Sequence, residues 1–207
     1  IGNGNGKKPE ITVNRDDVEV IKSYIPYEIT RHAPQAGHSD FLVIPALRAP
    51  LKMLSIFGDY RKKRLPISYL RSSIEQRWEL LQGLMDSDGF ISNHNGQAIY
   101  VTILPDLAED VLELLRSLGI KATKDLVQSE RYGKPNQPCY RVLFTAFDDM
   151  PVSRLQRKLT HRIKRTARAS TSEYIYISDI QPVASVPMQC IAVDAPSHLY
   201  LAGIGMV

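Results

Sequence analysis

The chain has 207 residues, of which 43% are hydrophobic and 23% charged, and its formal net charge is +4. This composition is typical of a globular protein with one or two domains and excludes a disordered or fibrous chain. No apolar run reaches the roughly 18 to 20 residues that a membrane-spanning helix needs. The two cysteines are too few for a disulfide framework or a zinc site of their own. The chain starts with Ile1 and has no basic-then-apolar leader, so we expect a cytoplasmic piece of a longer protein.

Short apolar segments in the first 57 residues predict three strands and two helices. The strands are expected at 10–13, 27–31 and 41–44, and the helices at 16–24 and 51–57. A stretch that contains proline, glycine and serine separates the second strand from the third and is typical of a turn.

The clearest predicted helix spans residues 73–86. Ser73 and Gln76 have the spacing of a capping box at its start. Gly83 interrupts the helix at a cost of about 1 kcal/mol relative to alanine, which favours close approach by a second helix. Gly89 is expected to end the helix in the left-handed conformation. The apolar stripe of this helix consists of Ile74, Trp78, Leu81, Leu84 and Met85.

The chain after this helix repeats a simple pattern of elements. Strands are expected at 90–92, 98–103, 122–129 and 140–145, and helices at 107–118 and 152–163. Residues 73–163 therefore read as helix, strand, strand, helix, strand, strand, helix. Residues 1–57 follow the same plan without its first helix, which indicates a degenerate internal repeat.

Positive charge gathers in two stretches of the chain. Residues 61–64 read Arg-Lys-Lys-Arg, and residues 150–172 contain seven cations and no carboxylate. Two such stretches favour two contact surfaces for a polyanion, because each cation near a phosphate releases a counterion. The alternative is that both stretches are ordinary solvated surface.

Residues 80–89 carry the motif that indicates chemistry, and they read Leu-Leu-Gln-Gly-Leu-Met-Asp-Ser-Asp-Gly. This segment resembles the LAGLIDADG motif of homing endonucleases. A carboxylate at the negative end of a helix dipole is unfavourable by a few tenths to about 1 kcal/mol, and a bound cation would offset that cost. A core helix that happens to end in an acidic cap is the alternative, but it explains neither Gly83 nor the position of the acid.

The resemblance extends over about residues 1–165 and is strongest to members that are encoded within inteins. It implies an α+β fold of two pseudo-symmetric αββαββα halves with saddle-shaped antiparallel sheets. The halves are expected at about 1–72, with a truncated first helix, and at about 73–165. The further matching segments are Lys63-Arg64-Leu65-Pro66, Tyr69-Leu70, Gly96-Gln97-Ala98-Ile99 and Leu107-Ala108-Glu109-Asp110-Val111.

The resemblance also implies a site where the two motifs meet. Asp88 is the acid of the second motif, and Ile1-Gly2-Asn3-Gly4 resembles the end of the first, so Asn3 stands where the first acid is expected. The implied metal is Mg²⁺, held by Asp88, Asn3 and Gly2. Because an amide brings no charge, cleavage is expected to be slow, limited to one strand or absent. The alternative is that Asn3 lies in a disordered end and has no role.

Two lysines are implied as catalytic partners of these metal ligands. Lys63 precedes Arg-Leu-Pro, where intein-encoded members carry a lysine that assists catalysis, and Lys158 ends the similar segment Arg-Leu-Gln-Arg-Lys. A metal-bound water would attack the scissile phosphate, and the lysines would polarise it or stabilise the developing charge. For Lys158, a phosphate contact alone stays open.

Further polar residues are candidates for contacts with double-stranded DNA. Strand and turn residues would read the major groove, and cations would contact phosphates, although an ordinary solvent-facing role is an alternative for each residue. The groove candidates are Asn93, His94, Gln97 and Arg141. The phosphate candidates are Lys62, Lys63, Arg64, Arg154, Arg157 and Arg162.

The last segment differs from the rest of the chain. A linker is expected at 166–173, and alternating apolar residues at 174–207 predict short strands. Residues 187–203 resemble the penultimate C-terminal block of inteins, which implies an incomplete all-β piece of a Hint-type splicing domain. Cys190 is then a candidate nucleophile and His198 a proton-transfer group; a buried, inert strand cysteine is the alternative. The chain stops before the His-Asn pair of that family, so we expect no splicing.

Three hypotheses stay open from the sequence. The first is an active, site-specific DNA endonuclease domain of an intein. The second is a DNA-binding domain that has lost cleavage, and the third is a splicing remnant with a decayed endonuclease. The expected partners are double-stranded DNA and, in cis, the exteins of a host such as a replicative DNA helicase; a monomer without membrane contact is expected.

Overall fold

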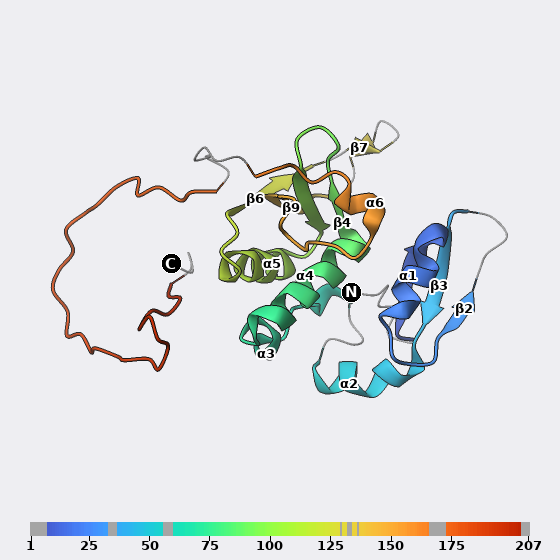
Figure 1. The fold of residues 1–207 in the computed structure, drawn as a ribbon, viewed down its shortest axis with the longest axis horizontal. Helices are drawn as coiled ribbons and strands as arrows, with labels where there is room; N and C mark the ends of the chain where they lie inside the picture. Colours follow the sequence, from blue (N-terminus) through green and yellow to red (C-terminus); the bar gives the residue numbers. More distant parts are fainter. Residues whose placement is uncertain are drawn as a thin grey trace.

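A computed structural model describes residues 8–32, 37–55, 60–128, 130–131, 134–135, 137–165 and 173–203. Over these ranges the chain forms two larger antiparallel sheets with helices packed beside them, and then a long extended segment (Figure 1). Among the described residues, no helix has the length and apolar character needed to cross a membrane.

The first sheet has three strands in the order β1-β3-β2. These are β1 (Glu10–Asn14), β2 (Thr30–His32) and β3 (Ser39–Val43). The 3₁₀ helix η1 (Arg15–Asp17) and α1 (Val18–Ser23) connect β1 to β2, and η2 (Pro45–Leu47) and α2 (Arg48–Met53) follow β3. The helix expected at 51–57 thus starts earlier, and residues 56–59 lie outside the described residues.

The second sheet has four strands in the order β4-β5-β9-β6. Its strands are β4 (Gly89–Ile91), β5 (Gln97–Thr102), β6 (Ala122–Val127) and β9 (Cys139–Thr145). The helices of this part are η3 (Tyr60–Lys62), α3 (Ile67–Leu70), α4 (Ile74–Asp88), α5 (Pro105–Ser117) and α6 (Gln156–Leu159). A small hairpin pairs β7 (Glu130–Arg131) with β8 (Lys134–Pro135).

The two sheets share one connectivity. In the first, β1 is followed by a helix, β2 and β3, and β3 pairs with both other strands. In the second, β5 is followed by a helix, β6, the small β7–β8 hairpin and β9, and β9 likewise pairs with both β5 and β6. The order β1-β3-β2 therefore corresponds to β5-β9-β6, as a repeated unit requires.

The main hydrophobic core lies between the second sheet and its helices. Alternate residues of the strands, such as Tyr100 and Val142, point toward α4 and α5 and are almost fully buried. Their helix partners include Leu81, Met85 and Leu114, which are also fully buried. The opposite face of the four-stranded sheet carries the remaining residues of each strand and is not part of this core.

Helix α4 begins as its sequence predicts, but it ends differently. The Ser73 hydroxyl accepts a hydrogen bond from the backbone N–H of Gln76, and the Gln76 side-chain oxygen accepts one from the backbone N–H of Ser73. These two bonds confirm the capping box. The left-handed conformation expected for Gly89 is wrong, because φ is −98° and ψ is 158°. Gly89 instead opens β4, and a Cβ there would lie 2.6 Å from the side chain of Met85. Close packing explains this glycine.

The basic helix expected at 152–163 is reduced to the four residues of α6. Two interactions hold the flanking residues out of a helix. Before α6, the Arg154 amide N–H donates to the Asp86 carboxylate. After α6, Ile163 forms a parallel bridge with Phe147. Each contact fixes the backbone in a nonhelical path, so the apolar periodicity of the segment overpredicts helix.

The strands expected at 174–207 are not found over residues 173–203, where the structure describes neither strand nor helix. Beyond its start, where Lys121 donates to the Tyr174 carbonyl, most of this orange-to-red segment runs away from the sheets in Figure 1. Its apolar side chains are exposed; Ile180, for example, is 82% exposed. A strand needs a neighbouring strand to pair its backbone, and none of the described strands lies along this segment. The Hint-type all-β piece is therefore not confirmed.

Candidate functional site

Asp88 is the last residue of α4, and its side chain is exposed. Its carboxylate accepts a hydrogen bond from the neighbouring Ser87 hydroxyl at 3.3 Å. A carboxylate at the C-terminal end of a helix meets the negative end of the helix dipole. The surrounding cations therefore decide whether the site is electrostatically favourable.

Lys63 and Tyr100 both interact electrostatically with Asp88. Burial lowers the pKa of Lys63, and the charge of Asp88 acts against that shift. Burial raises the pKa of the Tyr100 phenol well above its usual value, and the charge of Asp88 adds to the rise. Lys63 is thus a half-buried cation beside Asp88, as its position before the motif suggests. Tyr100, which pairs in register with Gly89, was not singled out from the sequence, where it reads only as a core strand residue.

Lys158 is buried at the end of α4, on the inner side of the same site. Its ammonium donates to the carbonyl oxygens of Met85 at 2.6 Å, Asp86 at 3.0 Å and Gly89 at 2.7 Å. Burial and the neighbouring Arg157 lower the pKa of Lys158, while nearby carboxylates that include Asp88 oppose the shift. The three ammonium donors are matched by three carbonyls, so Lys158 offsets the dipole at the helix end.

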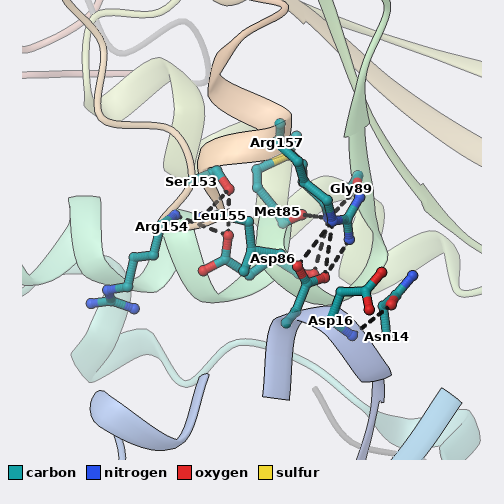
Figure 2. A network of polar contacts seen from close by, with 11 residues as sticks. Asn14, Asp16, Met85, Asp86, Gly89, Ser153, Arg154, Leu155 and Arg157 are labelled. Atoms are coloured by element: carbon teal, nitrogen blue, oxygen red, sulfur yellow. Dashed lines mark hydrogen bonds and ion pairs between the residues drawn. The ribbon is translucent and has the colours of Figure 1, made fainter. Parts of the chain in front are cut away.

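The two aspartates of the motif differ in what they contact. The Asp86 carboxylate accepts from the Ser153 hydroxyl and from the Arg154 backbone N–H, and so ties α4 to the segment before α6 (Figure 2). Within the described part of the chain, the Asp88 carboxylate accepts a hydrogen bond only from the adjacent Ser87, and its side chain is exposed. Asp86 therefore holds the fold, and Asp88 is available to a ligand.

A pair of contacts attaches the first sheet to this region. Arg157 of α6 binds the Asp17 carboxylate through two nitrogens, with Nε 3.0 Å from both oxygens. The guanidinium of Arg154 lies over the ring of Tyr24, 4.7 Å from its centroid. Asp17 and Tyr24 flank α1. The two arginines come from the basic stretch near the end of the second half, and Figure 2 shows both beside Asp86. The sequence gives no local signal for either contact.

Other cations of the two basic stretches also have intramolecular partners. Arg64 binds Asp110 through Nε and Nη2, and the hydrogen bond with this carboxylate raises the pKa of Arg64. Arg162 donates to the carbonyls of Leu159 and Met150. Lys62 is exposed. Phosphate contacts by these residues stay predictions.

The predicted groove readers lie on and beside the second sheet. Asn93 and His94 are exposed in the turn between β4 and β5. Gln97 and Arg141 belong to β5 and β9, and the alternation of buried residues puts both on the face away from the core. This face, which we call the open face, also carries Asp125 of β6, which pairs with Arg141.

The described residues supply only part of the implied metal site. They contain no group of three His, Cys, Asp or Glu side chains that could hold an ion. Gly2 and Asn3 lie outside the described residues. Over the described ranges nothing lies within 4 Å of a Cβ built on Gly83. Because Mg²⁺ prefers six oxygen ligands, the exposed Asp88 carboxylate fits as one of several.

The two residues predicted for splicing lie in the extended segment. Cys190 is exposed, so the alternative of a buried strand cysteine is wrong. His198 has a positive φ of 55°, and its Nδ1 lies 3.3 Å from the Val193 carbonyl oxygen. The roles of Cys190 and His198 stay predictions.

Comparison with known proteins agrees with the motif. Residues 75–150, from the first turn of α4 to the loop after β9, match the family described as LAGLIDADG-like domain. This segment is therefore similar to a LAGLIDADG-like domain. The replicative DNA helicase DnaB of Mycobacterium intracellulare is 34% identical over 166 residues, which cover 79% of this chain and 28% of that protein. The chain thus spans less than a third of that relative.

Two solved structures of I-DmoI also resemble this chain. The structure in complex with DNA and Mn has 12% identity and a TM-score of 0.42, and covers 65% of this chain and 71% of that chain. The structure with DNA and Ca has 11% identity and a TM-score of 0.43, and covers 65% of this chain and 66% of that chain.

Proposed function

We propose that this chain is the endonuclease part of an intein whose host is a replicative DNA helicase, and that it binds double-stranded DNA and hydrolyses its phosphodiester bonds. The observation that carries the proposal is an exposed motif carboxylate, Asp88, at the end of α4 with the cations of Lys63 and Lys158 beside it. The LAGLIDADG-like segment and the helicase relative support it.

Each residue of the site has a separate proposed role. Asp88, with Gly2 and Asn3, would hold Mg²⁺, which supplies Lewis-acid stabilisation of the reacting phosphate oxygens. Lys63 would stabilise negative charge on the phosphate, because a half-buried ammonium interacts strongly with an anion in a partly desolvated site. Lys158 would fix the end of α4, so that the Asp88 carboxylate is presented to solvent at a constant place.

The open face of the second sheet is the proposed DNA-reading surface. It carries donors and acceptors along two adjacent strands, and a hollow on this side is lined by Gln97, Lys121, Thr123 and Thr145 among others. A strand surface of this kind can enter the major groove, where each base pair presents a distinct pattern. Asn93 and His94 would extend the surface from the turn beside β5.

The test is Mg²⁺-dependent cleavage of plasmids that carry the uninterrupted coding sequence of a related helicase. We expect Asp88→Asn to abolish cleavage and to leave duplex binding nearly unchanged, because only a metal ligand is lost. Asp16→Asn is the matched control, because Asp16 is an exposed aspartate of η1. This variant should cleave DNA like the unmodified chain. Unaltered cleavage by Asp88→Asn would falsify its role as a metal ligand.

A second candidate function is DNA binding without cleavage. It is favoured by Asn3, an amide where the resemblance implies a carboxylate. In that case Asn3→Asp should raise cleavage, because it restores charge to the first metal site. Both candidates should bind duplex DNA with a binding constant whose logarithm falls linearly with the logarithm of salt concentration. A splicing remnant should show no such dependence.

A further inference from the structure

Arg141 and Asp125 form an ion pair on the open face of the second sheet. The two residues are direct cross-strand neighbours on β9 and β6, and Arg141 also lies opposite Val101 of β5. Val142 and Phe144 on the same strand β9 belong to the core, so the alternation sends Arg141 to the other face. The side chains remain 37% and 43% exposed. A charged pair thus stands in the middle of the surface proposed to read DNA.

The hydrogen bonds of this pair leave one edge of the guanidinium free. Arg141 Nε lies 2.9 Å from Oδ1 of Asp125, and Nη2 lies 2.6 Å from Oδ2. A guanidinium has five N–H donors, and this pairing uses two of them. The other three are both hydrogens of Nη1 and one of Nη2. Two of these point in parallel from the outer edge, the arrangement that contacts O6 and N7 of a guanine.

The pair is not needed to join parts of the fold. Strands β6 and β9 are already paired over six registers from Ala122 to Val127. By contrast, Arg64 reaches Asp110 across 46 positions, and Arg157 reaches Asp17 across 140. Hydrogen bonding to Arg141 lowers the pKa of Asp125, and Asp125 raises that of Arg141, so both stay charged at neutral pH. A fixed, charged guanidinium loses little conformational freedom when it meets a base.

We propose that Arg141 is a specificity-determining residue that reads a guanine in the major groove, and that Asp125 positions its guanidinium. This assignment rests on the proposed DNA-binding function. The recognised feature is the guanine of one G·C pair, contacted through the outer edge of Arg141. Asp125 acts through Arg141 and needs no contact with DNA.

The experiment selects bound sequences from a duplex library with a randomised central segment, in EDTA so that no metal-dependent cleavage occurs. The unmodified chain should enrich guanine at one position that depends on Arg141. Arg141→Gln should reduce that preference about 5- to 100-fold, the range expected for one bidentate contact, and leave other positions unchanged. Circular dichroism of each variant checks that it is folded.

Two further variants separate geometry from charge. Arg141→Lys keeps the positive charge but offers a point donor, so overall affinity should persist while the guanine preference is lost. Asp125→Asn should weaken the preference partially without lowering affinity, because a negative charge near DNA is removed. Arg141→Lys also keeps the test decisive if Arg141→Gln does not fold.

Lys124→Gln is the matched control for the loss of one cation. Lys124 precedes Asp125 on β6, but it points to the opposite face and binds Glu109 of α5. This variant should retain the preference at every position. If both Arg141 variants retain the same preferences as the unmodified chain, the assignment of Arg141 is overturned while DNA binding stands. If the unmodified chain enriches no sequence, the proposed function fails and this inference fails with it.

Discussion

The two sheets of this protein share a strand order but differ in what holds them in place. The second sheet packs on α4 and α5, and every residue of the main core cluster lies between Leu65 and Val152. The first sheet and α1 contribute only a few buried apolar residues, among them Val18 and Leu42. Burial of apolar side chains therefore stabilises the second half much more than the first, although the two halves have the same connectivity.

Ion pairs position the elements of the first half to a greater extent than those of the second. Asp40 of β3 is fully buried and binds Arg15 and Arg31, which lie beside β1 and on β2. Asp17 binds Arg157 and so attaches this half to α6. Buried ion pairs contribute little net stability but penalise alternative arrangements, since breaking one leaves a buried charge without a partner. A repeated topology therefore does not require a repeated source of stability.

The largest expected effect comes from the apolar core of the second half. Leu81→Ala should lower the free energy of unfolding by about 2–5 kcal/mol, because it leaves a cavity at a fully buried position. Chemical denaturation measures the change. Leu42→Ala is the matched variant in the first half, and hydrogen exchange should show loosening confined to residues 10–43. Loss of protection in both halves by Leu42→Ala would contradict the separate stabilisation of the two halves.

The next effect concerns the attachment of the first half. Asp17→Asn should destabilise that half by about 1–3 kcal/mol, because Arg157 loses a charged acceptor. Hydrogen exchange of residues 10–53 should rise while that of residues 74–145 stays the same. Lys22→Gln is the control, since it breaks an exposed helical pair with Glu19 worth only about 0.2–0.5 kcal/mol. An equal rise in both halves for Asp17→Asn would contradict the bridging role.

A pH dependence of stability should also arise in the first half, from Asp40. Burial pushes the pKa of Asp40 up, but hydrogen bonds from Arg31 and Arg15 outweigh it and hold the pKa below its usual value. The unfolded chain therefore binds this proton more readily, and the stability from Asp40 is present above about pH 4 and is lost as pH falls further. Asp40→Asn should flatten this acid loss in denaturation series below pH 4. A profile as steep as that of the unmodified chain would count against this role.

The smallest effect compares the caps of the two halves. Ser73→Ala should cost about 1 kcal/mol, because it removes the capping box of α4. Asn14→Ala removes the side-chain acceptor that caps η1 by binding the Asp16 N–H, and the loss should be smaller since η1 has only three residues. Thermal unfolding of both variants measures the difference. A larger loss for Asn14→Ala would indicate that the first half depends on its cap more than on its ion pairs.

Much of the fold was predictable because it depends on short-range patterns. The strands near residues 10, 90, 98 and 140 and the helices α4 and α5 were located from apolar periodicity, and the cap at Ser73 from local chemistry. The prediction that residues 80–89 carry a LAGLIDADG-like motif was confirmed by the family match. Each of these signals lies within about fifteen residues of sequence, where backbone preference and side-chain spacing act directly.

Other predictions depended on contacts that no local pattern encodes. Residues 152–163 have helical periodicity, but Asp86 and Phe147 hold parts of the segment in other conformations. Gly89 looked like a left-handed helix end, yet the packing of Met85 explains it. The strands expected after residue 173 have alternation but no partner strand among the described residues. In each case a tertiary contact, or its absence, decided the conformation.

The sequence by itself determined the order of the elements, the positions of the charged stretches and the identity of the acid at position 88. Only the tertiary structure decided which charges are neutralised within the protein, because partners such as Asp17 and Arg157 are 140 positions apart. It also placed Lys158 on three carbonyls at the end of α4 and Arg141 beside Asp125 on the open face. An ion pair forms where folding brings two opposite charges together, and the separation of the two residues along the sequence does not predict which charges will pair.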